Sequence, residues 1–206
     1  MASDALYREL VAGALEDSRL TARISFRLGE YVIHATDYAV VARAIRGRGT
    51  EGPVSVSRST GGKKRSSTRG SYRPKNNALW FNRRIWEDPS PFKPYGNWLK
   101  ERSTWVHEAT HCIQDLKDWR MTVGRAEMMA HIAQAIPLVR VNKHLLFNSK
   151  LVAAGVIAEK LLEPQRSGPV LAADLAALSG ELQKVQSYRE RWDKVFDFSV
   201  DADDGA

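Results

Sequence analysis

Residues 103–115 read S-T-W-V-H-E-A-T-H-C-I-Q-D and contain two histidines four positions apart. Positions four apart lie on one face of an α-helix, about one turn from each other, so His107 and His111 can reach a common ion. Neutral imidazole is a good ligand for zinc, which binds nitrogen and oxygen donors in a tetrahedral array. Glu108 is rotated about 100° from His107, which suits a general base acting on water beside the ion. The sequence therefore predicts a zinc site on His107 and His111, with Glu108 as the base.

The residues around this motif favour a buried helix over a solvated one. The motif lies within residues 97–118, whose apolar residues recur at helical spacing. Its uncharged neighbours are Thr104, Trp105, Val106, Ala109, Thr110, Cys112 and Ile113. Cys112 points about 100° away from His111, which favours a small buried apolar residue over a ligand. The alternative is an ordinary helix that carries the motif by chance.

A third protein ligand must come from elsewhere, because a catalytic zinc site keeps its fourth position for water. Glu127 lies 16 residues beyond His111, which leaves room for a link and an antiparallel return. Its neighbours are apolar, so an unpaired carboxylate there is costly unless a metal binds it. His131, one turn further on, is the rival ligand, or a group that orients a ligand or faces the substrate. Glu127 on an exposed helix start is the alternative that needs no metal.

A further residue near the motif has a candidate supporting role. Asp115, one turn beyond His111, either accepts a hydrogen bond from that imidazole and orients it, or is a solvated helix residue.

The rest of the chain predicts a single domain of the α+β class that is predominantly helical. Its 206 residues are 43% hydrophobic, enough for a real core, and its single cysteine excludes an intrachain disulfide. The spacing of apolar residues predicts helices over residues 4–16, 20–46, 97–118, 125–136, 147–162 and 171–196. Residues 31–33 also fit a strand, and Pro137 is expected to kink or end the fourth helix.

A β-hairpin is expected just before the motif, because a Pro-Lys-Asn-Asn turn separates two β-prone segments, the second over residues 78–82. Four parts of the domain are therefore predicted: an N-terminal helical part (1–46), a basic mobile loop (47–75), a catalytic core (70–136) and C-terminal helices (147–200).

Charge is distributed unevenly along the chain, whose net charge is +7. Residues 58–75 contain seven basic residues and no acidic one, a composition typical of a solvated loop. Nucleic-acid binding would favour aromatic residues interleaved with these charges, and only Tyr72 is present, so the pattern argues against it. An electrostatic handle for an acidic partner or substrate remains the other interpretation.

No segment resembles a signal peptide, and no stretch of 18 apolar residues predicts a membrane span. We expect a protein that is cytoplasmic or delivered by a secretion route that needs no signal peptide.

The motif and its surroundings resemble the zincin metallopeptidases, and in particular their gluzincin branch. The matching residues are His107-Glu108-Ala109-Thr110-His111 and Glu127 on a second helix. The order His-Glu-x-x-His-x-x-Gln-Asp and then Glu-x-x-Ala-x-x-x-Gln-Ala is similar to small metallopeptidase domains of bacterial toxins and effectors. The resemblance covers about residues 70–136.

This resemblance implies a zincin-like fold, with a small antiparallel sheet packed on an active-site helix, and a zinc-dependent endopeptidase acting on a protein or peptide. Leu79, Trp80 and Phe81 are then the edge strand that pairs with an extended substrate. Peptide hydrolysis would also need a donor for the developing oxyanion, for which the candidates are His131, Tyr95 and Tyr72, and the sequence does not choose among them. An inhibitor or immunity protein is a further partner of such enzymes. The alternative function is a non-enzymatic binding module that uses the basic loop at 58–75 to engage nucleic acid or an acidic partner.

Overall fold

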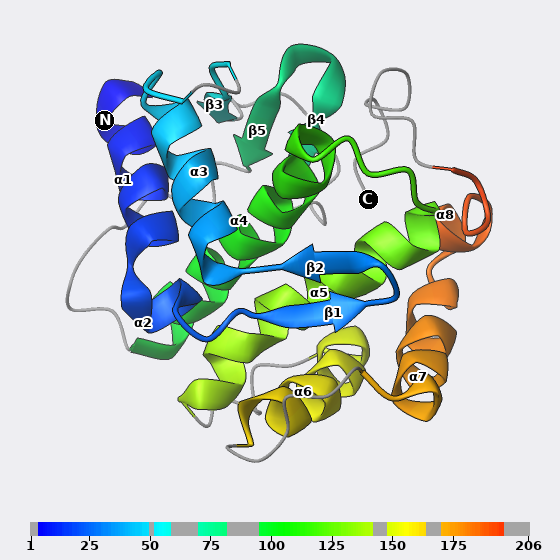
Figure 1. The fold of residues 1–206 in the computed structure, drawn as a ribbon. Coiled ribbons are helices and arrows are strands. Elements are labelled where there is room, and N and C mark those ends of the chain that lie inside the picture. Colours follow the sequence, from blue (N-terminus) through cyan, green and yellow to red (C-terminus); the bar gives the residue numbers. More distant parts are fainter. Residues whose placement is uncertain are drawn as a thin grey trace.

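The structure is a computed structural model that describes residues 4–49, 52–58, 70–81, 95–141, 148–163 and 170–195. It is of the α+β class and mostly helical, as predicted (Figure 1). Its elements are α1 (Asp4–Glu16), α2 (Ser18–Thr21), β1 (Phe26–Leu28), β2 (Tyr31–Ile33), α3 (Ala35–Ile45), β3 (Ser55–Arg58), β4 (Gly70–Arg73), η1 (Pro74–Asn76), β5 (Ala78–Phe81), α4 (Tyr95–Leu116), α5 (Val123–Arg140), α6 (Ser149–Leu162), α7 (Ala172–Gln183) and α8 (Gln186–Arg189).

The centre of the fold is α5, which lies between α4 and α6 (Figure 1). Its residues from Val123 to Val139 are nearly all buried, so the helix has no solvent-facing stripe. The prediction that Pro137 ends or kinks the helix near residue 136 is wrong in its end point, because α5 continues to Arg140. Packing on several sides outweighs the cost of about 3 kcal/mol that proline brings inside a helix.

One hairpin replaces part of a predicted helix. Residues 20–46 were expected to be helical, but β1 and β2 pair antiparallel there, with Phe26 opposite Ile33. Gly29 has φ +65°, the left-handed conformation that the tight turn requires. Burial alternates along both strands, and this period of two, rather than the helical spacing, sets the structure. The alternative strand at 31–33 is therefore confirmed.

The second sheet has the strand order β3-β5-β4. The predicted hairpin is confirmed, since β4 and β5 pair antiparallel and Asn77 takes the left-handed conformation between them at φ 44°. Two expectations are wrong. Leu79, Trp80 and Phe81 do not form an edge strand, because β5 is hydrogen-bonded to β3 on one side and to β4 on the other. The predicted loop at 47–75 contains β3 and β4, while its residues 59–69 lie outside the described residues.

The end of the described chain packs onto the start of α5. The single helix expected over residues 171–196 is instead α7, α8 and a turn, with residue 196 outside the described residues. The backbone N–H of Val123 donates to the carbonyl of Lys194 at 2.9 Å, and that of Gly124 donates to Trp192 at 3.0 Å. A Cβ on Gly124 would lie 2.4 Å from Trp192 Cε2, so only glycine permits this approach. These contacts satisfy N–H groups that a helix start leaves unpaired.

No helix among the described residues is long and apolar enough to cross a membrane.

Candidate metal centre

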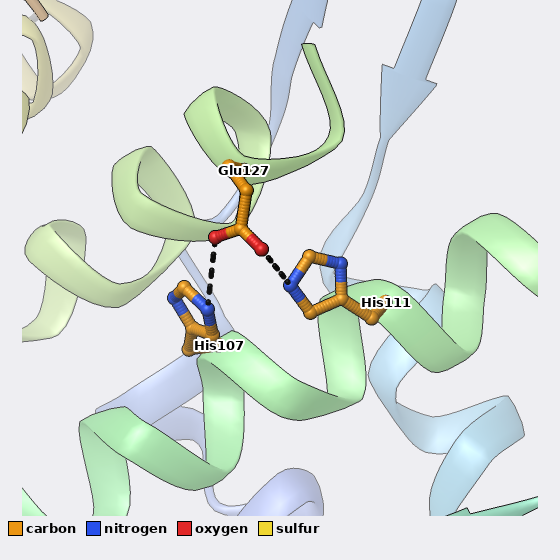
Figure 2. A group of neighbouring side chains, drawn as sticks. All are labelled: His107, His111 and Glu127. Carbon is orange, nitrogen blue, oxygen red and sulfur yellow. Dashed lines mark ion pairs between the residues drawn. The ribbon is translucent and has the colours of Figure 1, made fainter. Parts of the chain in front are cut away.

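Two helices bring the predicted ligands together. His107 and His111 lie one turn apart on α4, and Glu127 reaches between them from the second turn of α5 (Figure 2). His107 Nε2 lies 3.6 Å from Glu127 Oε2, and His111 Nε2 lies 3.5 Å from Glu127 Oε1. One candidate ligand atom from each of the three residues lies within 4.8 Å of the other two. We call these three buried residues the ligand cluster.

The ligand cluster could hold a metal ion, and its contacts are too long for direct hydrogen bonds. The distances of 3.5 and 3.6 Å exceed the usual 2.7–3.2 Å of an N–H···O bond. The two contacts run to different oxygens of the carboxylate, and one donor atom from each of the three residues lies within 4.8 Å of the other two, a spacing that leaves room for a metal ion. Among the described residues, Glu127 Oε2 and His107 Nδ1 are buried and have no hydrogen-bond partner. Two imidazoles and a carboxylate are a donor set that zinc and other divalent transition metals bind, so the residues present could hold such an ion.

His131, the rival ligand, lies beside the ligand cluster. Its Nε2 is 3.9 Å from Glu127 Oε2, and its ring meets that of His107 edge-on at 4.6 Å between centroids. Neither ring nitrogen makes a hydrogen bond of normal geometry with a described residue. His131 thus belongs to the wall of the site, whereas His107, His111 and Glu127 form the set with mutually close donor atoms.

Burial keeps two of these imidazoles neutral, the form that binds a metal. It lowers the pKa of His131 to about 3, with help from the charges of Lys150 and His111. Burial also holds the pKa of His107 well below its usual value, and the charges of His131 and His111 lower it further. The Gln134 amide opposes both shifts. At neutral pH their ring lone pairs are therefore free for a ligand.

Glu108 lies between the ligand cluster and the sheet. Burial raises the pKa of its carboxyl well above the ordinary value, the charge of Glu127 adds to the rise, and a hydrogen bond from the backbone N–H of Tyr72 in β4 opposes it. A Cβ on Gly70 would lie 3.0 Å from Glu108 Cγ and 2.9 Å from Phe81 Cδ1. The edge strand next to α4 is thus β4, and its backbone packs directly against the predicted base.

The supporting roles predicted for Asp115 and the tyrosines need correction. Asp115 does not orient His111, because its Oδ2 lies 2.5 Å from the hydroxyl of Tyr72. That hydroxyl also lies 2.9 Å from Asn77 Oδ1, so its single proton is already engaged and Tyr72 is a poor oxyanion donor. The imidazole of His111 faces Gln114 instead, with Nδ1 2.9 Å from Oε1. The side chain of Tyr95 lies outside the described residues.

Two further residues lie beside the site and were not predicted from the sequence: Lys150 in α6 and Tyr188 in α8. The ring of Tyr188 lies 6.4 Å from that of His131, and Lys150 Nζ lies 4.8 Å from the centre of the Tyr188 ring. Burial raises the pKa of the Tyr188 phenol well above its usual value, and the carboxylates of Glu127 and Glu108 add to this. Burial lowers the pKa of Lys150 and Glu127 opposes that shift. Neither residue belongs to a motif, so no local signal marks them.

No family model matches this chain, and neither the curated proteins nor the solved structures contain a match.

Proposed function

We propose that the protein is a zinc-dependent endopeptidase of the zincin type, with His107, His111 and Glu127 as ligands. The observation that carries the proposal is the convergence of three buried donor groups from two helices, with an unpartnered carboxylate oxygen on Glu127. A buried group of this kind costs about 1–3 kcal/mol when it has no partner, and a metal removes that cost. The buried Glu108, which follows the first ligand, adds the base that hydrolysis requires.

When bound, zinc supplies a Lewis acid that lowers the pKa of water and polarises the scissile carbonyl. Glu108 accepts the proton of the attacking water and passes it to the leaving amine. Its raised pKa brings the carboxyl closer to the pH at which it works, which favours proton transfer in both directions.

Tyr188 and Lys150 are the donors that we assign to the developing oxyanion. The phenol of Tyr188 lies close enough to Glu127 and Glu108 for both carboxylates to raise its pKa. Lys150 Nζ lies over the Tyr188 ring at 4.8 Å from its centre, and its charge acts on both His107 and His131, so its ammonium group is near negative charge that develops in the site. Fixed donors in a water-poor site stabilise such charge strongly.

An extended substrate is proposed to pair with β4 rather than with β5. The β5 strand has neighbours on both sides, whereas β4 borders α4 and contacts Glu108. Main-chain hydrogen bonds to β4 would hold the scissile bond of a protein or peptide beside the base. A role as a bacterial toxin or effector, with an immunity protein as partner, rests on the resemblance of the motif alone.

The test combines zinc content with peptidase activity. Elemental analysis should find near-stoichiometric zinc in the wild type, little in Glu127→Ala, and unchanged zinc in Glu108→Gln. Cleavage of an unstructured protein such as casein should fall by about 10²–10⁴-fold in Glu108→Gln, because general acid–base catalysis contributes that much. A wild type that holds no zinc even after reconstitution would refute the proposal, and charge reversal at Lys63, Lys64 and Arg65 would then test the binding-module alternative.

A further inference from the structure

We infer that Gln114 is a positioning residue that fixes the tautomer of His111 and ties that imidazole to the backbone next to Glu127. The tautomer is a property of the chain itself, whereas the effect on zinc affinity rests on the proposed function. Gln114 is fully buried at the contact between α4 and α5. It lies one turn beyond His111 and takes no part in the ligand cluster.

Two hydrogen bonds define the orientation of the Gln114 amide. Its Nε2 donates to the backbone carbonyl of Ala126 in α5 at 3.1 Å. Its Oε1 lies 2.9 Å from His111 Nδ1. A carbonyl oxygen can only accept, so the NH₂ end of the amide must face Ala126 and the oxygen must face His111. The reverse orientation would bring two carbonyl oxygens together in a buried site and lose the bond to Ala126.

The orientation of the amide then determines which nitrogen of His111 carries the proton. The amide oxygen has no hydrogen to give, so His111 Nδ1 must be the donor in this bond. A neutral imidazole with a proton on Nδ1 has its lone pair on Nε2. That is the atom that faces Glu127 Oε1 at 3.5 Å. A backbone carbonyl of α5 therefore sets, through one side chain, the nitrogen of His111 that can bind a metal.

The same side chain also links the positions of two ligands. Ala126 directly precedes Glu127, so the amide joins His111 on α4 to the backbone that carries the carboxylate on α5. His107 lacks this support at Nδ1, which has no hydrogen-bond partner of normal geometry among the described residues. The two histidines of the motif are thus held differently at Nδ1, where only His111 has such a bond.

Nitrogen-15 NMR of the metal-free protein tests the tautomer directly. At neutral pH the ring nitrogens of His111 should report a proton on Nδ1 in the wild type. Gln114→Met removes donor and acceptor at similar length, and should give a mixture of tautomers or a proton on Nε2. Gln114→Glu, protonated in this buried position, can donate to Ala126 and accept from His111, and should restore the wild-type signal. Gln134→Met, which changes a buried glutamine of α5 near His107 and His131, is the matched control and should leave His111 unchanged.

Zinc affinity, measured by competition with a chromophoric chelator, gives the second result. Gln114→Met should weaken binding about 10- to 100-fold, as loss of a partner that orients a ligand usually does. A wild-type His111 with its proton on Nε2, or a Gln114→Met tautomer equal to the wild type, would overturn the inference whatever the zinc result. The expected tautomers together with no zinc binding by any variant would support the inference and refute the proposed function. The wild-type spectrum suffices if Gln114→Met does not fold.

Discussion

Two of the polar contacts that join helices in the described part of the chain differ in kind. Arg46 joins the end of α3 to α1 through Glu9 at 2.8 Å and Glu16 at 2.7 Å, near the surface. The ligand cluster joins α4 to α5 within the core, at distances of 3.5 and 3.6 Å. The first contact has the geometry of charge-assisted hydrogen bonds, so Arg46 and both carboxylates have partners without any added ligand. The second leaves a buried carboxylate oxygen without a partner, so it suits an added ligand rather than the stability of the fold.

The largest change in the free energy of unfolding should come from Glu127→Met. The variant should be more stable than the wild type without zinc and less stable with it. With chelator present, the variant should be more stable than the wild type by about 1–3 kcal/mol, because an unsatisfied buried group is replaced by an apolar one of similar length. With zinc at about a thousand times the dissociation constant, the wild type should gain about 4 kcal/mol and the variant little. Urea unfolding under both conditions measures this reversal.

The Arg46 contact between α1 and α3 provides the control for the zinc-dependent change in stability. Arg46→Met removes a completed ion pair, so it should not stabilise the protein in either condition and should leave the zinc effect intact. A Glu127→Met variant that is less stable than the wild type without metal would show that the ligand cluster, like the Arg46 contact, stabilises the fold by itself.

A smaller loss of stability is expected from Gly70→Ala, which tests how closely β4 packs against Glu108. The new Cβ would lie 2.9 Å from Phe81 Cδ1 and 3.0 Å from Glu108 Cγ, so one of the two must move. Overpacking of this kind costs about 1–3 kcal/mol, and movement of Glu108 should also lower the peptidase rate. Thermal unfolding measures the loss of stability, and the cleavage assay measures the fall in the peptidase rate.

Gly13→Ala in α1 is the matched control, because nothing lies within 4 Å of its new Cβ. It should stabilise the protein by up to about 1 kcal/mol through helix propensity and leave activity unchanged. If Gly70→Ala and Gly13→Ala had the same stability and the same peptidase activity, β4 would not position Glu108.

The sequence predicted the part of the site that depends on local spacing. His107 and His111 share a helix face, and the apolar surroundings of Glu127 indicated a carboxylate with a special reason to be buried. Gln114 was not predicted to support His111, because that role depends on where the carbonyl of Ala126 lies after α5 packs on α4. Asp115, at a similar distance along the helix, was the candidate that the sequence offered for this role, but its carboxylate contacts Tyr72 instead.

The errors in the predicted fold also concern contacts between distant residues. β5 was expected at the edge from the resemblance to the zincin metallopeptidases, and its parallel neighbour β3 was missed because it lies in a Ser- and Arg-rich segment without a clear strand pattern. Residues 20–46 contain enough apolar residues to fit a helix, and only the turn at Gly29 distinguishes a hairpin. Tyr188 reaches the site because the turn after α8 pairs with the start of α5, which no spacing in the sequence shows.

The smallest effect should come from the Arg46 contact itself. Arg46→Met should lower the melting temperature slightly in dilute buffer, because exposed ion pairs contribute little net stability. The difference from the wild type should shrink further in about 1 M sodium chloride, where charges are screened within about 3 Å. The ligand cluster is buried, so the same salt should change zinc affinity much less than it changes this difference. If salt reduced the zinc affinity and the difference in melting temperature by similar fractions, the ligand cluster would be as open to solvent as Arg46, contrary to its burial.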